Sequence, residues 1–325
     1  MDPVTTRHVL GTSGIEVGPV GIGCNAFGAR IDGDQVVAVV DAAFEQGVTF
    51  FDTADTYALG ESETLLGAAL KGRRDEVVIA TKFGMDMQGR NGDDGGRRGS
   101  ADYVRRAAEA SLRRLGTDVI DLYQLHTPDP NTPVEETLGA MTRLVDEGKV
   151  RAIGCSNFTA WQLVDADWIS RTADLAHFAT AQNEYSLYNP AAEVELVPAC
   201  LELGVGLLPY FPLAYGLLTG KYSRDSEPQE GTRLAGQRAR WEGADWDRIE
   251  ALQAFARERD ITLLELAMGG LASRPAVASV IAGVSRPEQV ASNVAAAAWV
   301  PTAEDTAALD ELMAPRHSYT TFAPR

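Results

Sequence analysis

The stretch VTFFDTADTY, residues 48–57, indicates the fold and holds the first candidate residues for chemistry. It opens with a short apolar run, residues 48–51, rich in β-branched and aromatic residues, which is typical of a buried parallel strand. Asp52 and Tyr57 lie at or just past the end of this run. In parallel α/β sheets, active sites collect at the carboxyl ends of strands, so both side chains are candidates for an active site.

Two further apolar runs are followed by a residue suited to proton chemistry. Residues 77–80 precede Lys82, and residues 122–125 precede His126. Because these runs also have the composition of buried strands, we expect all four polar side chains to meet in one pocket.

The whole chain repeats this alternation of strand and helix. Amphipathic helical segments separate most of the predicted strands, for example at 34–46, 61–70, 100–115, 134–147 and 192–203. The eight strand-like segments are 19–23, 48–52, 77–82, 119–126, 150–154, 178–182, 205–209 and 278–282. The pattern predicts an α/β protein, a closed (β/α)₈ TIM barrel spanning residues 1–325 as one domain, with an open doubly wound sheet as the alternative.

Glycine-rich motifs weigh against the open sheet. An open nucleotide-binding sheet would carry GxGxxG after its first strand, but GIGCNA at 21–26 lacks the third glycine. The segment GLLTGKY at 216–222 is no P-loop, because its glycine spacing is short and Tyr222 replaces the required Ser or Thr. A hairpin with a glycine-containing turn is predicted at 8–17, before the repeating pattern begins.

Two long segments interrupt the regular alternation of predicted strands and helices. Residues 84–99 are rich in glycine and charge, which fits either a mobile loop over the active site or a solvated loop. Residues 210–245 follow the seventh predicted strand, where many barrels bind phosphate groups.

Charge and cysteine content exclude several classes of function. Lys and Arg total 29 against 46 Asp and Glu, a net charge of −17, which offers no electrostatic footprint for nucleic acid or an anionic membrane. Cys24, Cys155 and Cys200 show no CxxC spacing and lie in or beside apolar runs, so we expect reduced, packed thiols. No apolar stretch is long enough to span a bilayer and no signal peptide is evident, which predicts a cytoplasmic protein.

Lys82 at a buried strand end has three possible roles. It could pair with a nearby acid, form a Schiff base, or lower the pKa of a neighbouring phenol with its charge. Asp52 would keep Lys82 charged, Tyr57 would exchange the proton, and His126 could hydrogen-bond a substrate carbonyl. Each of these residues alone is more often structural, but the combination favours chemistry.

These segments closely resemble the aldo-keto reductase family over nearly the whole chain. The matching stretches, in order, are FDTADTY at 51–57, GESE at 60–63, LG at 66–67, ATKFG at 80–84, DLYQLH at 121–126, GKVRAIGCSNF at 148–158 and AQNEY at 181–185. The resemblance implies a (β/α)₈ barrel whose bottom is closed by the N-terminal hairpin, and an NAD(P)H-dependent carbonyl reductase without a metal. Within it, Tyr57 would be the general acid, Lys82 and Asp52 would tune it, and His126 would orient and polarise the carbonyl.

The resemblance also implies where the cofactor binds. Ser156, Asn157 and Gln182 would hold the nicotinamide carboxamide, and Tyr210 would stack on the ring. The pyrophosphate and adenosine would contact Leu213, Gly216, Leu218, Lys221, Gly283, Ser285, Arg286, Gln289 and Asn293. Arg286 beside a helix start could hold a 2′-phosphate, so we expect NADPH; an exposed helix-start charge is the other interpretation. Phe211 and Tyr215 depart from the family's usual serine and glycine.

The substrate is expected to be a bulky natural-product or sugar ketone. Its pocket would include Phe27, Phe83, Thr127, Tyr215 and Phe322, and the composition is typical of a GC-rich bacterial genome. Potassium-channel β subunits resemble the family too, so a cofactor-binding regulatory subunit is the main alternative, and a Schiff-base aldolase barrel a lesser one. A homo-oligomer is a possible assembly.

Overall fold

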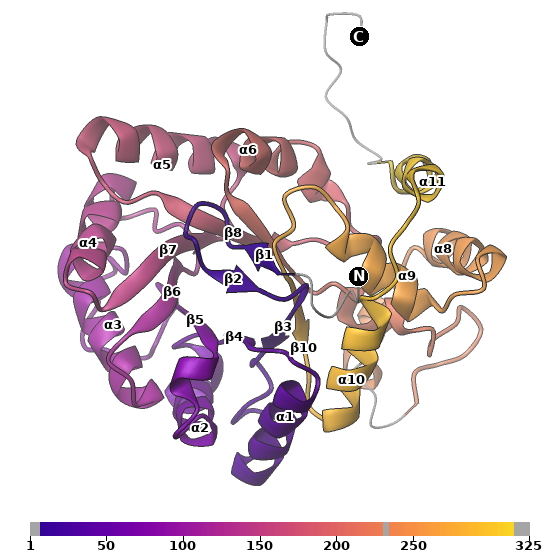
Figure 1. Ribbon diagram of the computed structural model, residues 1–325, viewed down its shortest axis with the longest axis horizontal. Coiled ribbons are helices and arrows are strands. Elements are labelled where there is room, and N and C mark those ends of the chain that lie inside the picture. The colour runs from indigo at the N-terminus through magenta and orange to yellow at the C-terminus, as the bar shows by residue number, and fades with distance from the viewer. Residues whose placement is uncertain (1–6, 230–233, 315–325) are drawn as a thin grey trace, which may run out of the picture.

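A closed barrel of parallel strands forms the centre of the protein in the computed structural model, which describes residues 7–229 and 234–314 (Figure 1). Its strands are hydrogen-bonded in chain order, and the last pairs with the first, so the ring has no free edge. They are β3 (Val20–Gly23), β4 (Phe50–Asp52), β5 (Val78–Phe83), β6 (Ile120–Leu125), β7 (Val150–Ser156), β8 (Phe178–Glu184), β9 (Gly206–Tyr210) and β10 (Val280–Gly283). The predicted closed barrel is confirmed, and the open sheet is wrong.

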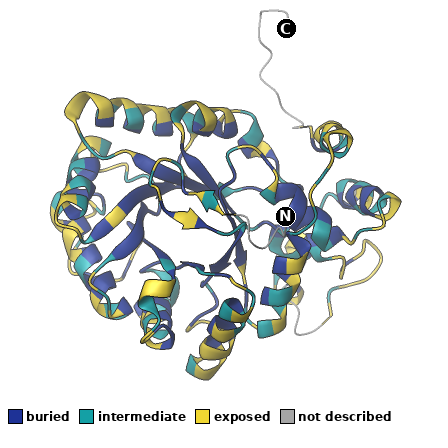
Figure 2. Cartoon of the chain, in the orientation of Figure 1, coloured by how far each residue is buried: buried dark blue, intermediate teal, exposed yellow. Residues whose placement is uncertain are grey.

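Helices lie outside the barrel, and most of them bury one face and expose the other (Figure 2). They are α1 (Gly33–Glu45), α2 (Glu61–Ala69), α3 (Ala101–Leu115), α4 (Val134–Asp146), α5 (Ala160–Ala173), α6 (Leu196–Leu203), α7 (Arg238–Glu242), α8 (Trp246–Glu258), α9 (Leu263–Ala272), α10 (Pro287–Ala296) and α11 (Ala303–Met313). Short 3₁₀ helices are η2 (Tyr57–Gly60), η3 (Arg74–Glu76), η4 (Ala191–Glu193), η5 (Ala214–Thr219) and η6 (Ala235–Gln237).

One predicted helix, 192–203, is divided in the structure. Its start forms η4, and the regular helix α6 begins only at Leu196. Pro198 lies in the first turn of α6, where its missing N–H costs no helical hydrogen bond; further along the helix it would break one. The position of this proline accounts for the late start of the helix.

A two-stranded hairpin, β1 (His8–Val9) and β2 (Glu16–Val17), closes one end of the barrel. Leu10, Ile15 and Val17 are buried and pack against interior barrel residues such as Phe50 and Leu208. In Figure 1 the hairpin lies in front of the strands, so this view looks at the closed end. Ligands must therefore enter from the opposite end, where the carboxyl ends of the strands lie.

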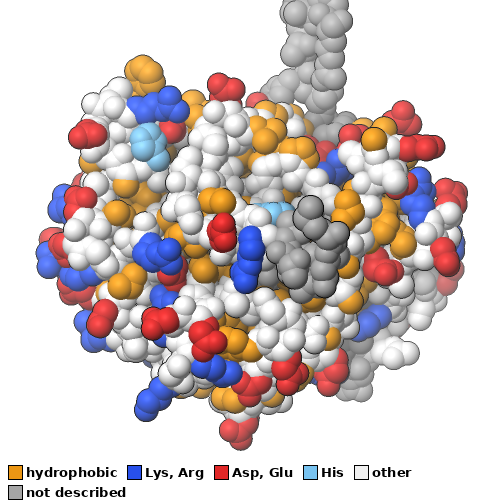
Figure 3. Space-filling view, in the orientation of Figure 1, with side chains coloured by type: hydrophobic (Ala, Val, Ile, Leu, Met, Phe, Trp, Pro, Cys, Tyr) orange, Lys and Arg blue, Asp and Glu red, His pale blue; other side chains and the backbone are white. Residues whose placement is uncertain are grey.

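Charges on the hairpin face are mixed. Acidic and basic side chains are interspersed with apolar ones over this face, and no single basic patch forms (Figure 3). None of the helices in the two described ranges combines the length and apolarity needed to span a bilayer. Cys24, Cys155 and Cys200 are buried free thiols, and burial raises the pKa of each.

Candidate active site

The four predicted chemical residues come from three neighbouring strands at the open end of the barrel. Asp52 is the last residue of β4, and Tyr57 begins the η2 turn five residues later. Lys82 is on β5, and His126 follows the last residue of β6, where its backbone N donates to Phe83 O at 2.8 Å. Consecutive parallel pairing of β4, β5 and β6 places these strand ends side by side.

Lys82, Asp52 and Tyr57 form a hydrogen-bonded group that we call the inner cluster. Lys82 Nζ lies 2.6 Å from Asp52 Oδ2, 2.8 Å from Thr53 O and 3.4 Å from Tyr57 OH. The Lys82 side chain is completely buried, and Asp52 is 2% exposed. Three oxygens therefore surround one buried ammonium group, and Asp52 and Tyr57 also border the cavity described below.

The charge state of this cluster follows from burial and pairing. Burial opposes the charge on Lys82, but Asp52 and then Tyr57 outweigh it and raise the pKa of Lys82 above its usual value. Lys82 therefore stays protonated, which disfavours a Schiff base, since that reaction needs a neutral amine.

The pKa of the Tyr57 phenol shifts in the direction opposite to the one expected from its neighbour Lys82. A neighbouring cation alone would lower its pKa, but burial raises the pKa by more than Lys82 lowers it, so the net shift is upward from 10. Tyr57 thus keeps its proton at neutral pH, which suits a proton donor.

His126 lies edge-on to Tyr57, with ring centroids 5.9 Å apart. Burial, followed by the charge of Lys82, lowers the pKa of His126 to about 3. The imidazole is therefore neutral and can donate one N–H to a carbonyl oxygen without carrying a charge. Its Nδ1 is buried and has no hydrogen-bond partner within 7–229 and 234–314.

Two glutamines hold the second oxygen of Asp52. Gln182 Nε2 donates to Asp52 Oδ1 at 2.8 Å, and Gln124 Nε2 donates to the same oxygen at 3.3 Å. The sequence analysis missed Gln124. The available signal was strand alternation, because Gln124 precedes His126 by two residues and shares its face of β6.

A cavity of about 670 Å³ opens above the inner cluster. Asp52, Tyr57 and His126 line it, whereas Lys82 lies completely buried behind them. The predicted cofactor residues that line the cavity are Ser156, Asn157, Gln182, Tyr210, Leu213, Gly216, Lys221, Gly283, Ser285, Arg286 and Gln289. Leu218 and Asn293 do not line it; both are buried in the protein, at 0% and 5% exposure.

One end of the cavity offers the groups that a nicotinamide carboxamide needs. Asn157 Oδ1 accepts from Tyr210 OH at 2.7 Å, and Asn157 Nδ2 donates to His126 O at 2.9 Å. Gln182 uses its Nε2 on Asp52, which leaves its carbonyl oxygen available to an amide donor. Ser156 contributes a hydroxyl, and the Tyr210 ring borders the same space. The donor set fits the carboxamide and ring of a nicotinamide.

The other end of the cavity is basic. Arg30, Lys221 and Arg286 line it, and none of the three pairs with a carboxylate of the described chain. Free cations beside the N-terminus of α10 fit the phosphates of a dinucleotide. The sequence analysis did not single out Arg30, which lies in the loop after β3.

The predicted substrate residues are only partly brought together. Tyr215 lines the cavity, but Thr127 is not among the lining residues. Phe27 and Phe83 are completely buried in the core, so the prediction that they line the pocket is wrong. Lys82 points into the barrel, so its neighbour Phe83 points outward and stacks on Tyr123 at 4.7 Å. Phe322 lies outside the described residues.

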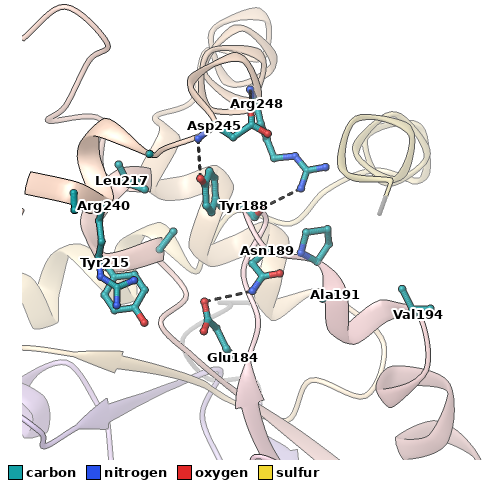
Figure 4. A pocket seen from close by; sticks show the side chains of 14 residues that line it. Glu184, Tyr188, Asn189, Ala191, Val194, Tyr215, Leu217, Arg240, Asp245 and Arg248 are labelled. Atoms are coloured by element: carbon teal, nitrogen blue, oxygen red, sulfur yellow. Dashed lines mark hydrogen bonds between the residues drawn. The ribbon is translucent and has the colours of Figure 1, made fainter. Parts of the chain in front are cut away.

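A second cavity, of about 580 Å³, shares Tyr215 with the first (Figure 4). Arg240 stacks on the Tyr215 ring with its guanidinium carbon 3.7 Å from the centroid, and Asn189 Nδ2 lies 3.4 Å from Glu184 Oε1. No residue of the inner cluster borders this space, and neither does His126. The side chains suited to proton chemistry therefore lie at the first cavity and not at the second.

Comparisons with known proteins identify the family of the chain. The profile of the Aldo/keto reductase family matches residues 19–314. A soybean (Glycine max) protein named "Probable aldo-keto reductase 1" is 35% identical over 296 residues, which cover 89% of this chain and 83% of the relative. An Arabidopsis thaliana protein named "Probable voltage-gated potassium channel subunit beta" is 32% identical over 303 residues, 90% of this chain and 91% of the relative. The chain belongs to the aldo/keto reductase family and is an oxidoreductase.

Proposed function

We propose that the protein reduces a ketone or aldehyde to an alcohol with NADPH, using Tyr57 as the general acid. The observation that carries the proposal is the inner cluster at the base of the cavity, where Lys82 Nζ lies 3.4 Å from Tyr57 OH and 2.6 Å from Asp52. The carbonyl carbon would receive its hydride from the nicotinamide when the cofactor is bound. Residues of this chain donate the proton, stabilise the charge that results and orient the carbonyl.

Tyr57 donates its phenolic proton to the carbonyl oxygen as negative charge develops there. Lys82, held protonated by Asp52, stabilises the phenolate that remains after the transfer. The neutral imidazole of His126 donates a hydrogen bond to the same carbonyl oxygen and orients it. Gln124 and Gln182 fix the carboxylate of Asp52, so the ammonium group keeps its place beside Tyr57.

NADPH is proposed over NADH because of the cations at the basic end of the cavity. Arg286 precedes α10, and its guanidinium makes no ion pair with a described carboxylate. A 2′-phosphate at this position would gain a bidentate contact. Replacing Arg286 with Ala should weaken NADPH binding by roughly tenfold or more and leave NADH binding nearly unchanged, as measured by fluorescence titration with both cofactors. Equal losses for the two cofactors would contradict this assignment.

The proposed substrate is a bulky natural-product or sugar ketone. Met85 and Tyr215 supply apolar and aromatic surface to the cavity. With Phe27 and Phe83 buried elsewhere, these two residues are the first candidates for contacts with the substrate.

The decisive experiment compares wild type with Tyr57→Phe. NADPH consumption is followed at neutral pH against a panel of aldehydes and bulky ketones, with cofactor binding followed by fluorescence quenching. The variant should lose roughly 10²- to 10⁴-fold in turnover and bind NADPH almost as before, because only the acid proton is removed. Normal turnover by the variant would show that another group is the acid.

A second candidate function is a cofactor-binding regulatory subunit. The observation in its favour is the similarity, along most of both chains, to a protein named as a probable potassium channel β subunit. Both candidates predict NADPH binding, but only the reductase predicts efficient turnover. A wild-type protein that quenches NADPH fluorescence and reduces no member of the panel would favour the regulatory role.

A further inference from the structure

The loop between β5 and α3, residues 84–100, has a buried anchor. Asn91 is 5% exposed although its neighbours in the loop are mostly exposed. Its Nδ2 donates to Asp55 Oδ2 at 2.9 Å, and its Oδ1 accepts from Arg114 Nη1 at 3.2 Å. Met87 of the same loop is also buried, at 1% exposure. The loop is therefore held in place at Asn91. The sequence had suggested either a mobile loop or a solvated loop, and neither interpretation included such a buried contact.

Arg114 extends this contact into a buried group that we call the outer cluster: Asp55, Glu63, Asn91 and Arg114. Arg114 Nε lies 2.6 Å from Glu63 Oε2, and Thr81 Oγ1 donates to Glu63 Oε1 at 2.5 Å. Thr81 precedes Lys82 on β5, and successive side chains of a strand point to opposite faces. The outer cluster thus lies on the helix side of the same strand that carries Lys82 inside the barrel.

Asp55 connects the outer cluster to the segment that carries the acid. It lies two residues before Tyr57, and its backbone N donates to Lys82 O at 3.0 Å. The backbone N of Tyr57 donates to Ala54 O at 3.2 Å, so the chain turns tightly from Asp55 to Tyr57. On the other side of Asn91, Met85 lines the cavity that also contains Tyr57 and His126.

We propose that Asn91 is a positioning residue, which ties loop 84–100 through Asp55 to the segment carrying Tyr57. The inference rests on the proposed reductase function. The same amide that seats the loop, and with it Met85, also fixes the backbone that sets the distance from Tyr57 OH to Lys82 Nζ. Loss of the Asn91 amide therefore disturbs the substrate wall and the proton donor together.

Asp55 accepts from Asn91 with or without a charge. The groups that face Asp55 are Glu63 of α2, Arg114 and Tyr103 of α3, and Tyr123 of β6. Burial, and then Glu63, raises the pKa of Asp55 to about 8, so the carboxyl is mostly neutral at pH 7. Asp55→Asn keeps an acceptor oxygen for Asn91, whereas Asp55→Ala removes it. This pair of variants separates the hydrogen bond from the ionisation.

The kinetic test uses Asn91→Ala, Asp55→Ala, their double variant, and Asp55→Asn. The control is Asn131→Ala, which removes another amide bond to the same loop, from Asn131 Nδ2 to Gly96 O at 2.8 Å, at the surface. Asn91→Ala and Asp55→Ala should each lower kcat roughly tenfold, and the double variant no further, because both remove the same hydrogen bond between Asn91 and Asp55. Asp55→Asn and the control should stay within about twofold of wild type. A wild-type kcat for Asn91→Ala, or additive losses in the double variant, would overturn the inference.

A second readout does not depend on turnover. Hydrogen–deuterium exchange should become faster in Asn91→Ala at both 53–57 and 84–92, whereas Asn131→Ala should affect only 93–99. Faster exchange in the loop alone would refute the coupling to the Tyr57 segment. A wild type that reduces no carbonyl would refute the reductase function and leave this exchange experiment valid, so the two failures are distinguishable.

Discussion

The inner and outer clusters are two buried groups of acids and bases on opposite faces of one strand. Lys82 of the inner cluster and Thr81, which contacts the outer cluster, are consecutive residues of β5. Inside the barrel, one carboxylate, Asp52, faces one ammonium, and a phenol completes the group. Outside it, two carboxyls, Asp55 and Glu63, share the single guanidinium of Arg114.

This difference in stoichiometry gives the clusters different properties. The balanced inner pair raises the pKa of Lys82 and keeps a fixed charge beside the phenol. In the outer cluster, burial and then the charge of Glu63 raise the pKa of Asp55 to about 8, because the single guanidinium of Arg114 does not offset them. Burial of acids and bases alone therefore does not create an active site. The inner cluster borders a cavity, whereas no residue of the outer cluster lines that cavity, and Asn91 of loop 84–100 lies against its Asp55.

Removal of the inner cation should have the largest effect. Lys82→Met leaves Asp52 buried without its ion partner, which should cost about 3–5 kcal/mol of the free energy of unfolding and lower turnover by roughly 10²-fold or more. The pH–rate profile should also change, because the charge beside Tyr57 is gone. Urea unfolding and kinetics at several pH values check both effects.

Lys149→Met is the matched control for this variant. Lys149 forms ion pairs with Glu109 and Glu147 at the surface, so its loss should change stability by no more than about 1 kcal/mol. An unchanged pH–rate profile in Lys82→Met would remove the proposed role of Lys82 in tuning Tyr57.

Asp55 of the outer cluster should make the free energy of unfolding depend on pH. The unfolded carboxyl of Asp55 loses its proton near pH 4, and the folded one keeps it up to about pH 8. Between these values the folded state binds the extra proton, so this residue's contribution to stability is complete below pH 4 and declines by up to about 1.4 kcal/mol per pH unit as pH rises. Asp55→Asn should lack this decline.

Unfolding of wild type and Asp55→Asn in urea at pH 5 and pH 7.5 measures the difference in slope. The control is Asp41→Asn, a surface acid paired with Arg73, which should leave the slope of wild type unchanged. Parallel slopes for wild type and Asp55→Asn would mean that Asp55 is ionised throughout this range.

The smallest effect is expected at Gln124. Gln124→Leu removes the longer of the two amide bonds to Asp52 Oδ1, at 3.3 Å, and keeps the bond from Gln182 at 2.8 Å. Turnover should fall roughly two- to fivefold, with little change in stability, because this bond is long and Gln182 still holds the same carboxylate oxygen. Thr180→Val, at another buried barrel position, is the control and should retain full turnover. A loss as large as that of Lys82→Met would give Gln124 a more direct part in the chemistry.

The sequence predicted the strands of the barrel well. Each predicted strand lies within two residues of the observed one at both ends, because short β-branched runs between amphipathic helices leave few other ways to bury apolar surface. The same pattern placed Asp52, Tyr57, Lys82 and His126 at one end of the barrel, since parallel strands point their carboxyl ends the same way. Their roles in catalysis remain predictions that the variants above will test.

Other properties of the site depend on contacts between distant segments, which the periodicity of the sequence does not encode. Phe27 and Phe83 are apolar and close in sequence to site residues, but strand alternation and a folded-back loop turn them into the core. The balance of burial against charge at Tyr57, which raises its pKa where a cation alone would lower it, depends on distances between three chain segments. Asn91 likewise holds loop 84–100 only because Asp55, which precedes η2, and Arg114 of α3 lie close enough to bond with it. Local sequence patterns define the strands, and they therefore define which residues can reach the open end of the barrel. Their surroundings, and with them their charge states and contacts, follow only from how distant segments pack together.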